Sequence, residues 1–267
     1  MYNYSDNHQE YLKKIKKEKR TIILFQVLIS VLFLISWELL SHFRMINPFL
    51  YSSPSNIIKT ISTLISDGAL FIHIWITTYE TIISFLLASC IGFFIATILW
   101  WNKKIALIFD PYLIILNSLP KVALGPLIII WVGASIRSII VMSLFISIFV
   151  VIINIYNGFS ATDKNYIKLL KSFGATKFQI FFKGVLPANY ITIINSLKLN
   201  ISMSLIGIIM GELLVSKSGL GYLIVYGSQV FNINLVITSV FILGILSYLF
   251  YLIINQLERY IIKNTKQ

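Results

Sequence analysis

The sequence predicts an all-α, polytopic membrane protein with about six transmembrane helices. Hydrophobic residues make up 57% of the 267 positions and charged residues only 12%, whereas soluble domains carry about 25% charged residues. The mean hydropathy of the whole chain is +0.85. Apolar runs of about 20 residues recur along it, and each is long enough to cross roughly 30 Å of hydrocarbon as a helix.

Six apolar runs, divided by polar or glycine-containing breaks, are the expected spans. They cover residues 21–41, 74–100, 106–131, 138–157, 188–214 and 233–256. The first run follows a basic segment but lacks the small-residue cleavage site of a signal peptide, so we expect an uncleaved helix. The third run is interrupted by "SLPK".

The segment between the first two runs, residues 47–68, is expected to hold a short amphipathic helix that does not span the membrane. Ser53 or Ser55 can cap its N-terminus, and Asp67-Gly68 can end it. Glu38, near the end of the first run, is expected to reach the membrane interface and to have no functional role.

Positively charged residues are concentrated in alternate breaks between the runs. With a cytoplasmic N-terminus, 16 of the 22 Lys and Arg residues lie in cytoplasmic segments, as the positive-inside rule requires. We therefore expect a multi-pass protein of the bacterial cell membrane with both termini in the cytoplasm. The net charge of +12 follows from this topology and does not form a binding groove, so no nucleic-acid partner is expected.

This topology divides the chain into three parts. Residues 1–20 are the expected basic, cytoplasmic N-terminal segment, 21–258 the transmembrane domain and 259–267 a cytoplasmic tail. The transmembrane domain includes a cytoplasmic hairpin at 160–187, which is the longest polar break between spans.

This break has the pattern of two short helices. Thr162 or Asp163 can cap the first helix, and Gly174 can end it, because glycine adopts the left-handed conformation at low cost. Thr176-x-x-Gln179 fits a capping box for the second helix. Both arms are amphipathic, so their apolar faces must pack on the spans, on another protein or, as an alternative, on anionic lipid headgroups.

No pattern for catalysis, metal binding or nucleotide binding is visible. The single cysteine, Cys90, lies within an apolar run and the three histidines are scattered, so neither a disulfide framework nor a metal-ligand pair is expected. There is no G-x-x-x-x-G-K-[ST] loop, so this chain cannot hold ATP by the P-loop mechanism. We expect no catalytic residue, no metal and no cofactor bound by this chain.

The stretch "LLKSFGATKFQIFFKGVLP", residues 169–187, resembles the loop that defines the permease subunits of ABC importers. Gly174 matches the glycine of that loop, and Val185 to Pro187 match its Ile/Val-x-Leu-Pro ending apart from one missing spacer residue. Leu169 and Leu170 occupy the places of its alanines. Lys168 stands where an acidic residue is usual.

The resemblance extends along nearly the whole chain, about residues 50–260. Three further blocks are similar to those of permeases for nitrate, sulfonate, taurine and related compounds, namely "YSSPSNIIKTI" (51–61), "NSLPKVALGPLIIIWVGAS" (117–135) and "GELLVSKSGLGYLI" (211–224). The order of the blocks and the topology agree with that family. The resemblance implies a fold like that of a type I ABC importer permease.

The resemblance also implies a non-enzymatic transport subunit and its partners. These are a second permease copy in a homodimer, cytoplasmic ABC ATPase subunits that use the ATP, an extracytoplasmic solute-binding protein and the lipid membrane. The residues implied in ATPase coupling lie within 163–183 and are Lys168, Leu169, Leu170, Phe173, Gly174, Ala175, Thr176 and Phe178. The implied cargo is a small anion of the nitrate, sulfonate or taurine type, with a pyrimidine-type thiamine precursor as the alternative.

Polar and ionisable residues within the spans are candidates for the translocation pathway, because they are costly in lipid. These are Lys121, Asn195, Lys198, Asn200, Ser204 and Glu212. The polar stripe on the fifth run can face a pore or join helices, and both alternatives stay open. Lys198 and Lys121 would suit an anionic cargo, and Glu212 is expected to pair with a cation on a neighbouring helix.

Two other classes of protein have less support. An intramembrane enzyme could use Glu80 or Glu212, but no nucleophile–base pair or metal cluster is visible within the spans. A secondary carrier usually has internal repeats and discontinuous helices, but the break at "SLPK" has no counterpart in the second half of the chain.

Overall fold

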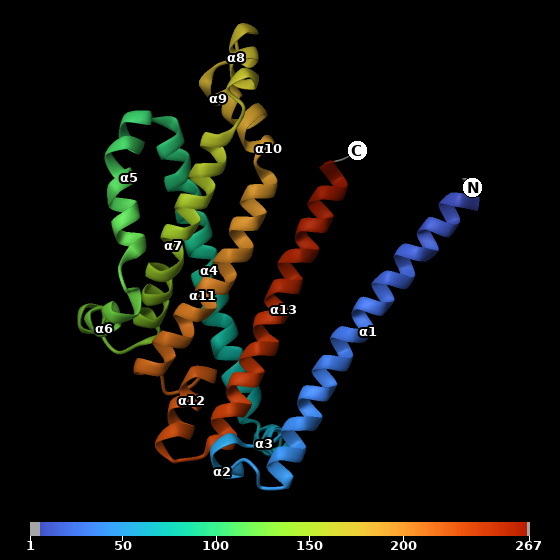
Figure 1. Cartoon of the computed structure of the whole chain (residues 1–267). Coiled ribbons are helices and arrows are strands. Elements are labelled where there is room, and N and C mark those ends of the chain that lie inside the picture. The colour runs from blue at the N-terminus through green and yellow to red at the C-terminus, as the bar shows by residue number, and fades with distance from the viewer. Residues whose placement is uncertain (1–5, 266–267) are drawn as a thin grey trace. The chain divides into compact units, whose positions relative to one another are not determined.

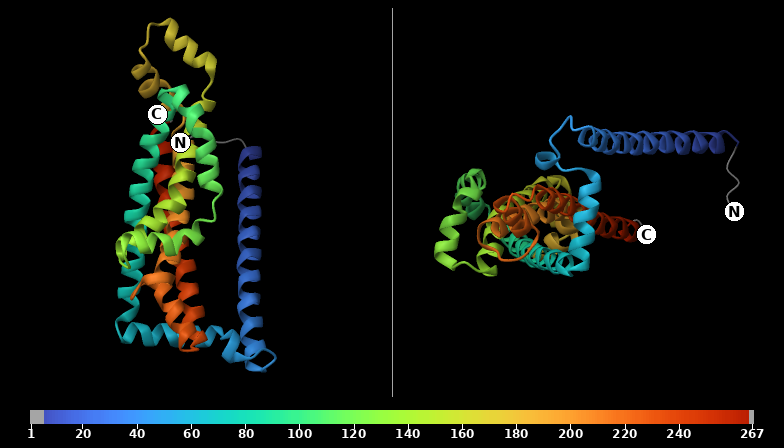
Figure 2. Two further views of the ribbon diagram at one scale, coloured as in Figure 1. Left: turned by 90° about the vertical axis from the view of Figure 1, so that its left-hand side faces the viewer. Right: turned by 90° about the horizontal axis from the view of Figure 1, so that it is seen from below.

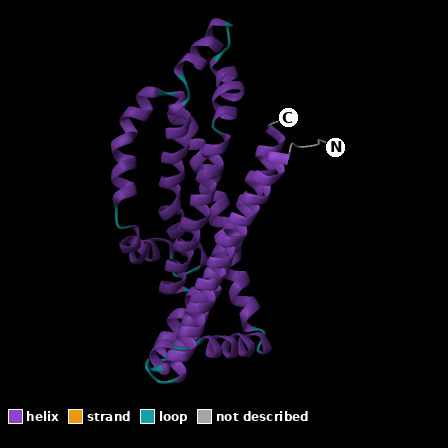
Figure 3. Cartoon of the chain, turned by 45° about the vertical axis from the view of Figure 1, so that its right-hand side comes forward, coloured by secondary structure: helices purple, strands orange, loops and turns teal. Residues whose placement is uncertain are grey.

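The computed structural model describes residues 6–265, which form helices and loops without a β-strand (Figures 1 and 3). The first five residues of the expected N-terminal segment and the last two of the expected tail lie outside this range. The chain divides into two units, Met1–Thr63 and Leu64–Gln267. The prediction of an all-α protein is confirmed.

The first unit contains α1 (Asp6–His42), α2 (Pro48–Tyr51) and most of α3 (Pro54–Ser66). α1 begins well before residue 21, where the first span was expected, because the preceding basic segment is rich in the helix formers Lys and Glu and contains neither Gly nor Pro.

The short amphipathic helix expected within 47–68 is α3, and Ser53 caps it. The Ser53 Oγ accepts a hydrogen bond from the Asn56 N–H at 3.2 Å. Glu38 of α1 accepts two further bonds, from the Ser55 N–H at 3.0 Å and the Ser55 Oγ at 2.7 Å. The Glu38 carboxylate thus ties the end of α1 to the start of α3, a structural contact that the sequence analysis did not predict.

Four long helices form the second unit: α4 (Ala69–Trp101), α7 (Ile136–Ala161), α11 (Tyr190–Val215) and α13 (Ile233–Thr265). α7 packs against both α4 and α11, and α11 also packs against α13. Small residues allow this close approach. A Cβ added to Gly207 of α11 would lie 2.5 Å from the Ser143 Cα of α7.

The third expected span is broken. It consists of α5 (Lys103–Ser118), a 3₁₀ turn η1 (Lys121–Leu124) and α6 (Gly125–Val132), with a bend of 85° at the break. Pro120 lacks an N–H and holds the preceding Leu119 in an extended conformation, with ψ 142°. Five described helices are long and apolar enough to cross a membrane, or six if this bent pair is one span. The prediction of about six spans is confirmed.

Two short segments lie at opposite ends of the second unit. The hairpin between α7 and α11 lies at one end (yellow in Figure 2), which we call the hairpin end. At the other end, the α12 end, α12 (Leu220–Gln229) lies between α11 and α13 and packs against both. Sequence analysis missed α12, because its ten residues are too few to show a clear helical period.

Candidate coupling hairpin and translocation pathway

The hairpin consists of four short helical pieces joined by one corner. They are α8 (Lys164–Ser172), α9 (Lys177–Ile180), a π-helical turn η2 (Phe181–Val185) and α10 (Leu186–Ala188). Asp163 caps α8 by accepting a hydrogen bond from the Asn165 N–H at 2.8 Å. Thr162, the other candidate cap, accepts instead from the Asn189 Nδ2 at 2.7 Å, which joins the two ends of the hairpin.

Gly174 forms the corner of the hairpin in the left-handed conformation, with φ +75°. Its N–H donates to the Lys171 carbonyl, and the Ala175 N–H donates to the Leu170 carbonyl, which is the pattern of a Schellman helix end. A Cβ added to Gly174 would meet no atom within 4 Å. The corner therefore needs glycine for its backbone conformation and not for space.

The second arm begins with the expected capping box. The Gln179 N–H donates to the Thr176 Oγ1 at 3.3 Å, and the Thr176 N–H donates to the Gln179 Oε1 at 2.8 Å. The wide π turn then carries the chain to Pro187. A proline has no N–H and its ring clashes with the carbonyl four residues earlier in a regular α-helix, here that of Lys183. The wider turn avoids this clash.

Phe181 anchors the second arm on the bundle. It is 1% exposed, and its ring centroid lies 5.0 Å from that of Trp100 and 5.4 Å from that of Phe159. Lys177 adds a polar anchor, since its Nζ donates to the Trp101 carbonyl and lies 5.7 Å from the Trp101 ring centroid. The hairpin is thus fixed to the ends of α4 and α7.

The first arm, α8, has three separate stripes. Ile167 and Leu170 pack against the buried cluster around Phe181. A second stripe of Tyr166, Leu169 and Phe173 is apolar but exposed, and Phe173 is 80% exposed. The third stripe is basic and exposed; its members, four and three residues apart, are Lys164, Lys168 and Lys171.

The eight expected coupling residues therefore fall into two groups. Two are half-buried and face the bundle, Leu170 and Ala175. Six are exposed and available to a partner, namely Lys168, Leu169, Phe173, Gly174, Thr176 and Phe178.

Asn200 and Ser204, expected on a polar stripe of α11, lie between helices. The Asn200 Nδ2 donates to the Phe85 carbonyl at 3.0 Å and to the Ser89 Oγ at 2.8 Å, both on α4. The Ser204 carbonyl accepts from the Ser143 Oγ of α7 at 2.8 Å. The Asn200 side chain therefore joins α11 to α4, and the Ser143 hydroxyl joins α7 to the backbone of α11, as Asn and Ser do in other membrane proteins.

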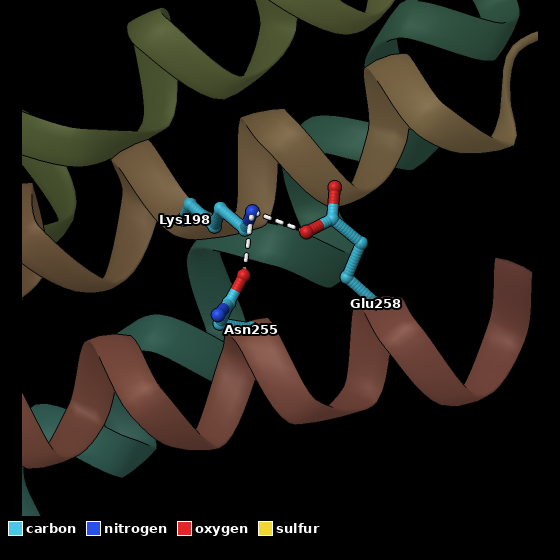
Figure 4. Close-up of polar contacts among 3 residues, drawn as sticks. All are labelled: Lys198, Asn255 and Glu258. Carbon is cyan, nitrogen blue, oxygen red and sulfur yellow. Dashed lines mark hydrogen bonds and ion pairs between the residues drawn. The ribbon is translucent and has the colours of Figure 1, made fainter. Parts of the chain in front are cut away.

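Lys198, also on α11, is paired with α13 (Figure 4). Its Nζ lies 2.5 Å from the Glu258 Oε2 and 3.4 Å from the Asn255 Oδ1. The two charged side chains are 19% and 16% exposed. Because Glu258 offsets the charge of Lys198, this lysine is not a free anion-binding group. Asn195 is exposed and does not join this contact.

Lys121 lies at the bend of the third span and contacts α5 and α7. Its Nζ donates to the Asn117 Oδ1 at 3.0 Å and to the Ile146 carbonyl at 3.3 Å. These bonds attach the bend to α7. Lys121 and Lys198 are therefore held by different partner helices.

Glu212, near the end of α11, holds the turn that leads into α12. Its Oε1 accepts from the Thr77 Oγ1 and its Oε2 from the Gly221 N–H, both at 2.6 Å. The expectation that Glu212 pairs with a cation was wrong, since its partners are a hydroxyl and a backbone amide. Gly219 has φ +109°, and a Cβ there would lie 2.3 Å from the Glu212 Oε1, so the turn requires glycine.

Glu80 lies one turn after Thr77 on α4 and is 0% exposed. Within the described residues neither of its carboxylate oxygens has a hydrogen-bond partner. A buried polar group without a partner is costly. One pattern in the sequence could have revealed this cluster, since His73, Thr77 and Glu80 follow helical spacing on α4. The His73 Nδ1 accepts a hydrogen bond from the Gly219 N–H at 2.9 Å.

A cavity of about 340 Å³ opens beside Glu80 at the α12 end, lined also by Ser135 and Lys217. Among the described residues no group of three or more His, Cys, Asp or Glu side chains is arranged to hold a metal. The arrangement of these polar residues fits helix joining and turn capping, and no nucleophile–base pair is formed by Glu80 and Glu212.

Comparison with known protein families matches residues 88–267 to the family described as binding-protein-dependent transport system inner membrane component. The chain is 29% identical over 233 residues to the formylaminopyrimidine transport permease protein ThiX of Halalkalibacterium halodurans, with 86% of this chain and 92% of that protein covered. It is 27% identical over 254 residues to the putative aliphatic sulfonates transport permease protein SsuC of Bacillus subtilis, covering 95% and 92%.

The fold is also found in a solved structure. A chain of the MetNI methionine ABC transporter in an inward-facing conformation matches with a TM-score of 0.64 and 22% identity, covering 73% of this chain and 97% of that chain. At this identity the likeness concerns the fold alone.

Proposed function

This chain belongs to the family of binding-protein-dependent transport system inner membrane components, and on that premise we propose that its hairpin couples the spans of an ABC importer to a separate cytoplasmic ATPase. The observation that carries this proposal is that one part of the hairpin is anchored to the helix bundle while another part is exposed. Its second arm is fixed to α4 and α7 through Phe181 and Lys177, while its corner presents Phe173 to solvent.

Such a hairpin can act as a lever. A partner that binds the corner moves α8 and α9 together as a rigid unit, because the glycine corner and the two helix caps fix their relative geometry. The Asn189–Thr162 bond and the buried Phe181 pass that movement to α7, α11 and α4. Alternation between inward and outward states then requires only a second stable packing of these helices.

The orientation and the partners follow from this role. The hairpin end faces the cytoplasm and the ATPase, which hydrolyses the ATP, and the α12 end faces an extracytoplasmic solute-binding protein. The distribution of Lys and Arg favours a cytoplasmic position for both termini. A second permease copy completes the pathway.

The cargo that we propose is a small solute. The sequence favours an anion of the nitrate, sulfonate or taurine type, and the relative from Bacillus subtilis named for aliphatic sulfonates supports it. A pyrimidine-type thiamine precursor is the second candidate, supported by the relative named for formylaminopyrimidine. One structural observation favours this second candidate. Glu258 offsets the charge of Lys198, so Lys198 of α11 is not free to bind an anionic cargo.

Reconstituted transport tests the proposal. Proteoliposomes containing this chain, its co-purified ATPase and the solute-binding protein should take up one of two labelled solutes, an alkanesulfonate or a formylaminopyrimidine, only when ATP and the ATPase are present. Uptake driven by an ion gradient without the ATPase would instead identify a secondary carrier and contradict the proposal.

A further inference from the structure

The hairpin carries charge of one sign only. Between Lys164 and Pro187 the five charged residues are all lysines, and all five are exposed: Lys164, Lys168, Lys171, Lys177 and Lys183. The nearest acidic residue, Asp163, is used as the cap of α8. A surface with several lysines and no carboxylate repels a basic partner and attracts an acidic one.

Two of these lysines line a groove beside the corner. The groove has a volume of about 550 Å³, and its walls include Trp100, Ile167, Lys171 and Lys177. Lys177 is held in place by the Trp101 carbonyl, so one ammonium group of the groove is fixed before any partner arrives. Within the described residues no carboxylate lines this groove. A carboxylate side chain of a partner fits it by charge and by size.

The hairpin also exposes three aromatic side chains. Phe173, Phe178 and Phe182 are 80%, 61% and 47% exposed, and the rings of Phe178 and Phe182 lie 4.4 Å apart between centroids. Exposed aromatic side chains that are rimmed by lysines are typical of a protein interface.

Two observations favour a protein over a lipid surface as the occupant. A helix lying on headgroups needs one apolar face, whereas the hairpin has a rigid glycine corner and two capped arms. In addition, α8 and α9 form the outermost part of the second unit at the hairpin end, beyond α4 and α5 (Figure 1). The corner of the hairpin and its exposed aromatic side chain therefore project beyond the rest of the second unit.

We propose that the hairpin selects an ATPase whose docking surface is acidic, with an Asp or Glu side chain entering the groove between Lys171 and Lys177 and an apolar pocket receiving Phe173. This inference rests on the proposed function and adds to it the chemistry of the partner. Lys168, which stands where related permeases usually have an acidic residue, extends the same basic stripe. Lys168 excludes an ATPase that has a basic side chain opposite it, because like charges repel.

A zero-length carbodiimide cross-linker tests the contact, because it joins a lysine amine directly to a carboxylate in contact with it. The complex of the full-length chain with its co-purified ATPase is placed in nanodiscs containing phosphatidylserine, cross-linked and analysed by peptide mass spectrometry. We expect links from Lys168 or Lys171 to an Asp or Glu of the ATPase. Lys217, an exposed lysine at the α12 end, is the matched control and should form none.

Substitutions give a second readout. Lys168→Glu combined with Lys171→Glu should lower the yield of co-purified ATPase at least about tenfold, since like charges across an interface cost several kcal/mol. Lys217→Glu should leave the yield unchanged. Neither Lys168 nor Lys171 anchors the hairpin, and an unaltered melting temperature of the double variant in detergent checks its folding.

Three results would overturn the inference. Co-purification that survives the double charge reversal would show that charge does not select the partner. Links from Lys168 and Lys171 to phosphatidylserine, with none to the ATPase, would identify an anionic lipid surface as the occupant. If the wild-type chain retains no ATPase at all, the proposed coupling function fails together with this inference, and that outcome is distinct from the other two.

Discussion

At the scale of the residue, Glu212 shows how one buried carboxylate organises the α12 end. It accepts hydrogen bonds from Thr77 of α4 and from the Gly221 N–H at the start of α12, so a single side chain on α11 connects three helices. Glu80, one turn after Thr77 on α4, is buried and has no hydrogen-bond partner among the described residues. The two glutamates therefore have opposite effects on stability.

Replacing Glu212 by Ala is expected to destabilise the protein. The change leaves the Thr77 hydroxyl and the Gly221 N–H without an acceptor, and each unsatisfied buried group costs about 1–3 kcal/mol. Glu80→Gln should keep or raise stability, because a neutral amide costs less to bury than a carboxylate without a partner. Melting temperatures in detergent measure both effects. An equal loss of stability in the two variants would contradict these roles.

The Lys198–Glu258 pair gives a second prediction. Lys198→Gln alone should destabilise the chain, because it leaves Glu258 half-buried without its cation. The double variant Lys198→Gln/Glu258→Gln should regain most of the lost stability, because no charge is left without its partner. It should also keep ATP-dependent uptake, because the pair serves to join α11 to α13. Loss of uptake in a stable double variant would instead assign Lys198 to an anionic cargo.

Local residue patterns were predictable, and contacts between helices were not. Gly174, the Thr176–Gln179 capping box and Ser53 were predicted because each depends on neighbours within a few residues. The partners of Lys198 and Glu212 lie 60 and 135 residues away in the chain. Only the packing of helices brings such residues together, so the sequence left pore lining and helix joining as equal alternatives.

At the scale of the element, the second arm of the hairpin anchors it to the helix bundle, whereas the first arm ends in an exposed aromatic side chain. Phe181 is 1% exposed and Phe173 is 80% exposed, although the two residues belong to one amphipathic hairpin. Periodicity predicted both as apolar positions but could not say which of them packs on the bundle, because both stripes have the same spacing.

This difference predicts two opposite phenotypes. Phe181→Ala should destabilise the hairpin by about 3–5 kcal/mol, the usual cost of removing a buried Phe side chain. Phe173→Ala should leave the melting temperature unchanged but reduce the retained ATPase. Thermal unfolding and co-purification of the two variants check this. A stable Phe181→Ala variant with normal uptake would show that the second arm is not anchored there.

Element boundaries were predictable only where a clear stop signal exists. Gly68 ends the segment before α4 as expected, with φ +69°. Pro120 was recognised as an interruption of the third span, but the 85° bend depends on how η1 packs against α7. The length of α1 was underestimated, since charged residues were taken as the end of a helix when they end only its apolar part.

At the scale of the whole molecule, hydropathy and charge distribution predicted the architecture. Apolar runs of this length must form helices in a bilayer, because no water satisfies their backbone groups. For that reason the number of spans was the most secure prediction. The proposed assembly of this chain with an ATPase and a second copy would depend on exposed surfaces, and exposed surfaces leave little trace in a hydropathy profile.

The central claim is that the hairpin transmits the movement of an ATPase to the spans through its glycine corner, and ATP-dependent uptake by Gly174→Leu measures it most directly. Gly68→Leu is the matched control, because both glycines have positive φ and neither has an atom within 4 Å of an added Cβ. The account predicts normal membrane insertion of both variants, with at least about tenfold lower uptake for Gly174→Leu only, since the substitution strains the left-handed corner. Normal uptake by Gly174→Leu with the ATPase bound at wild-type yield would contradict it.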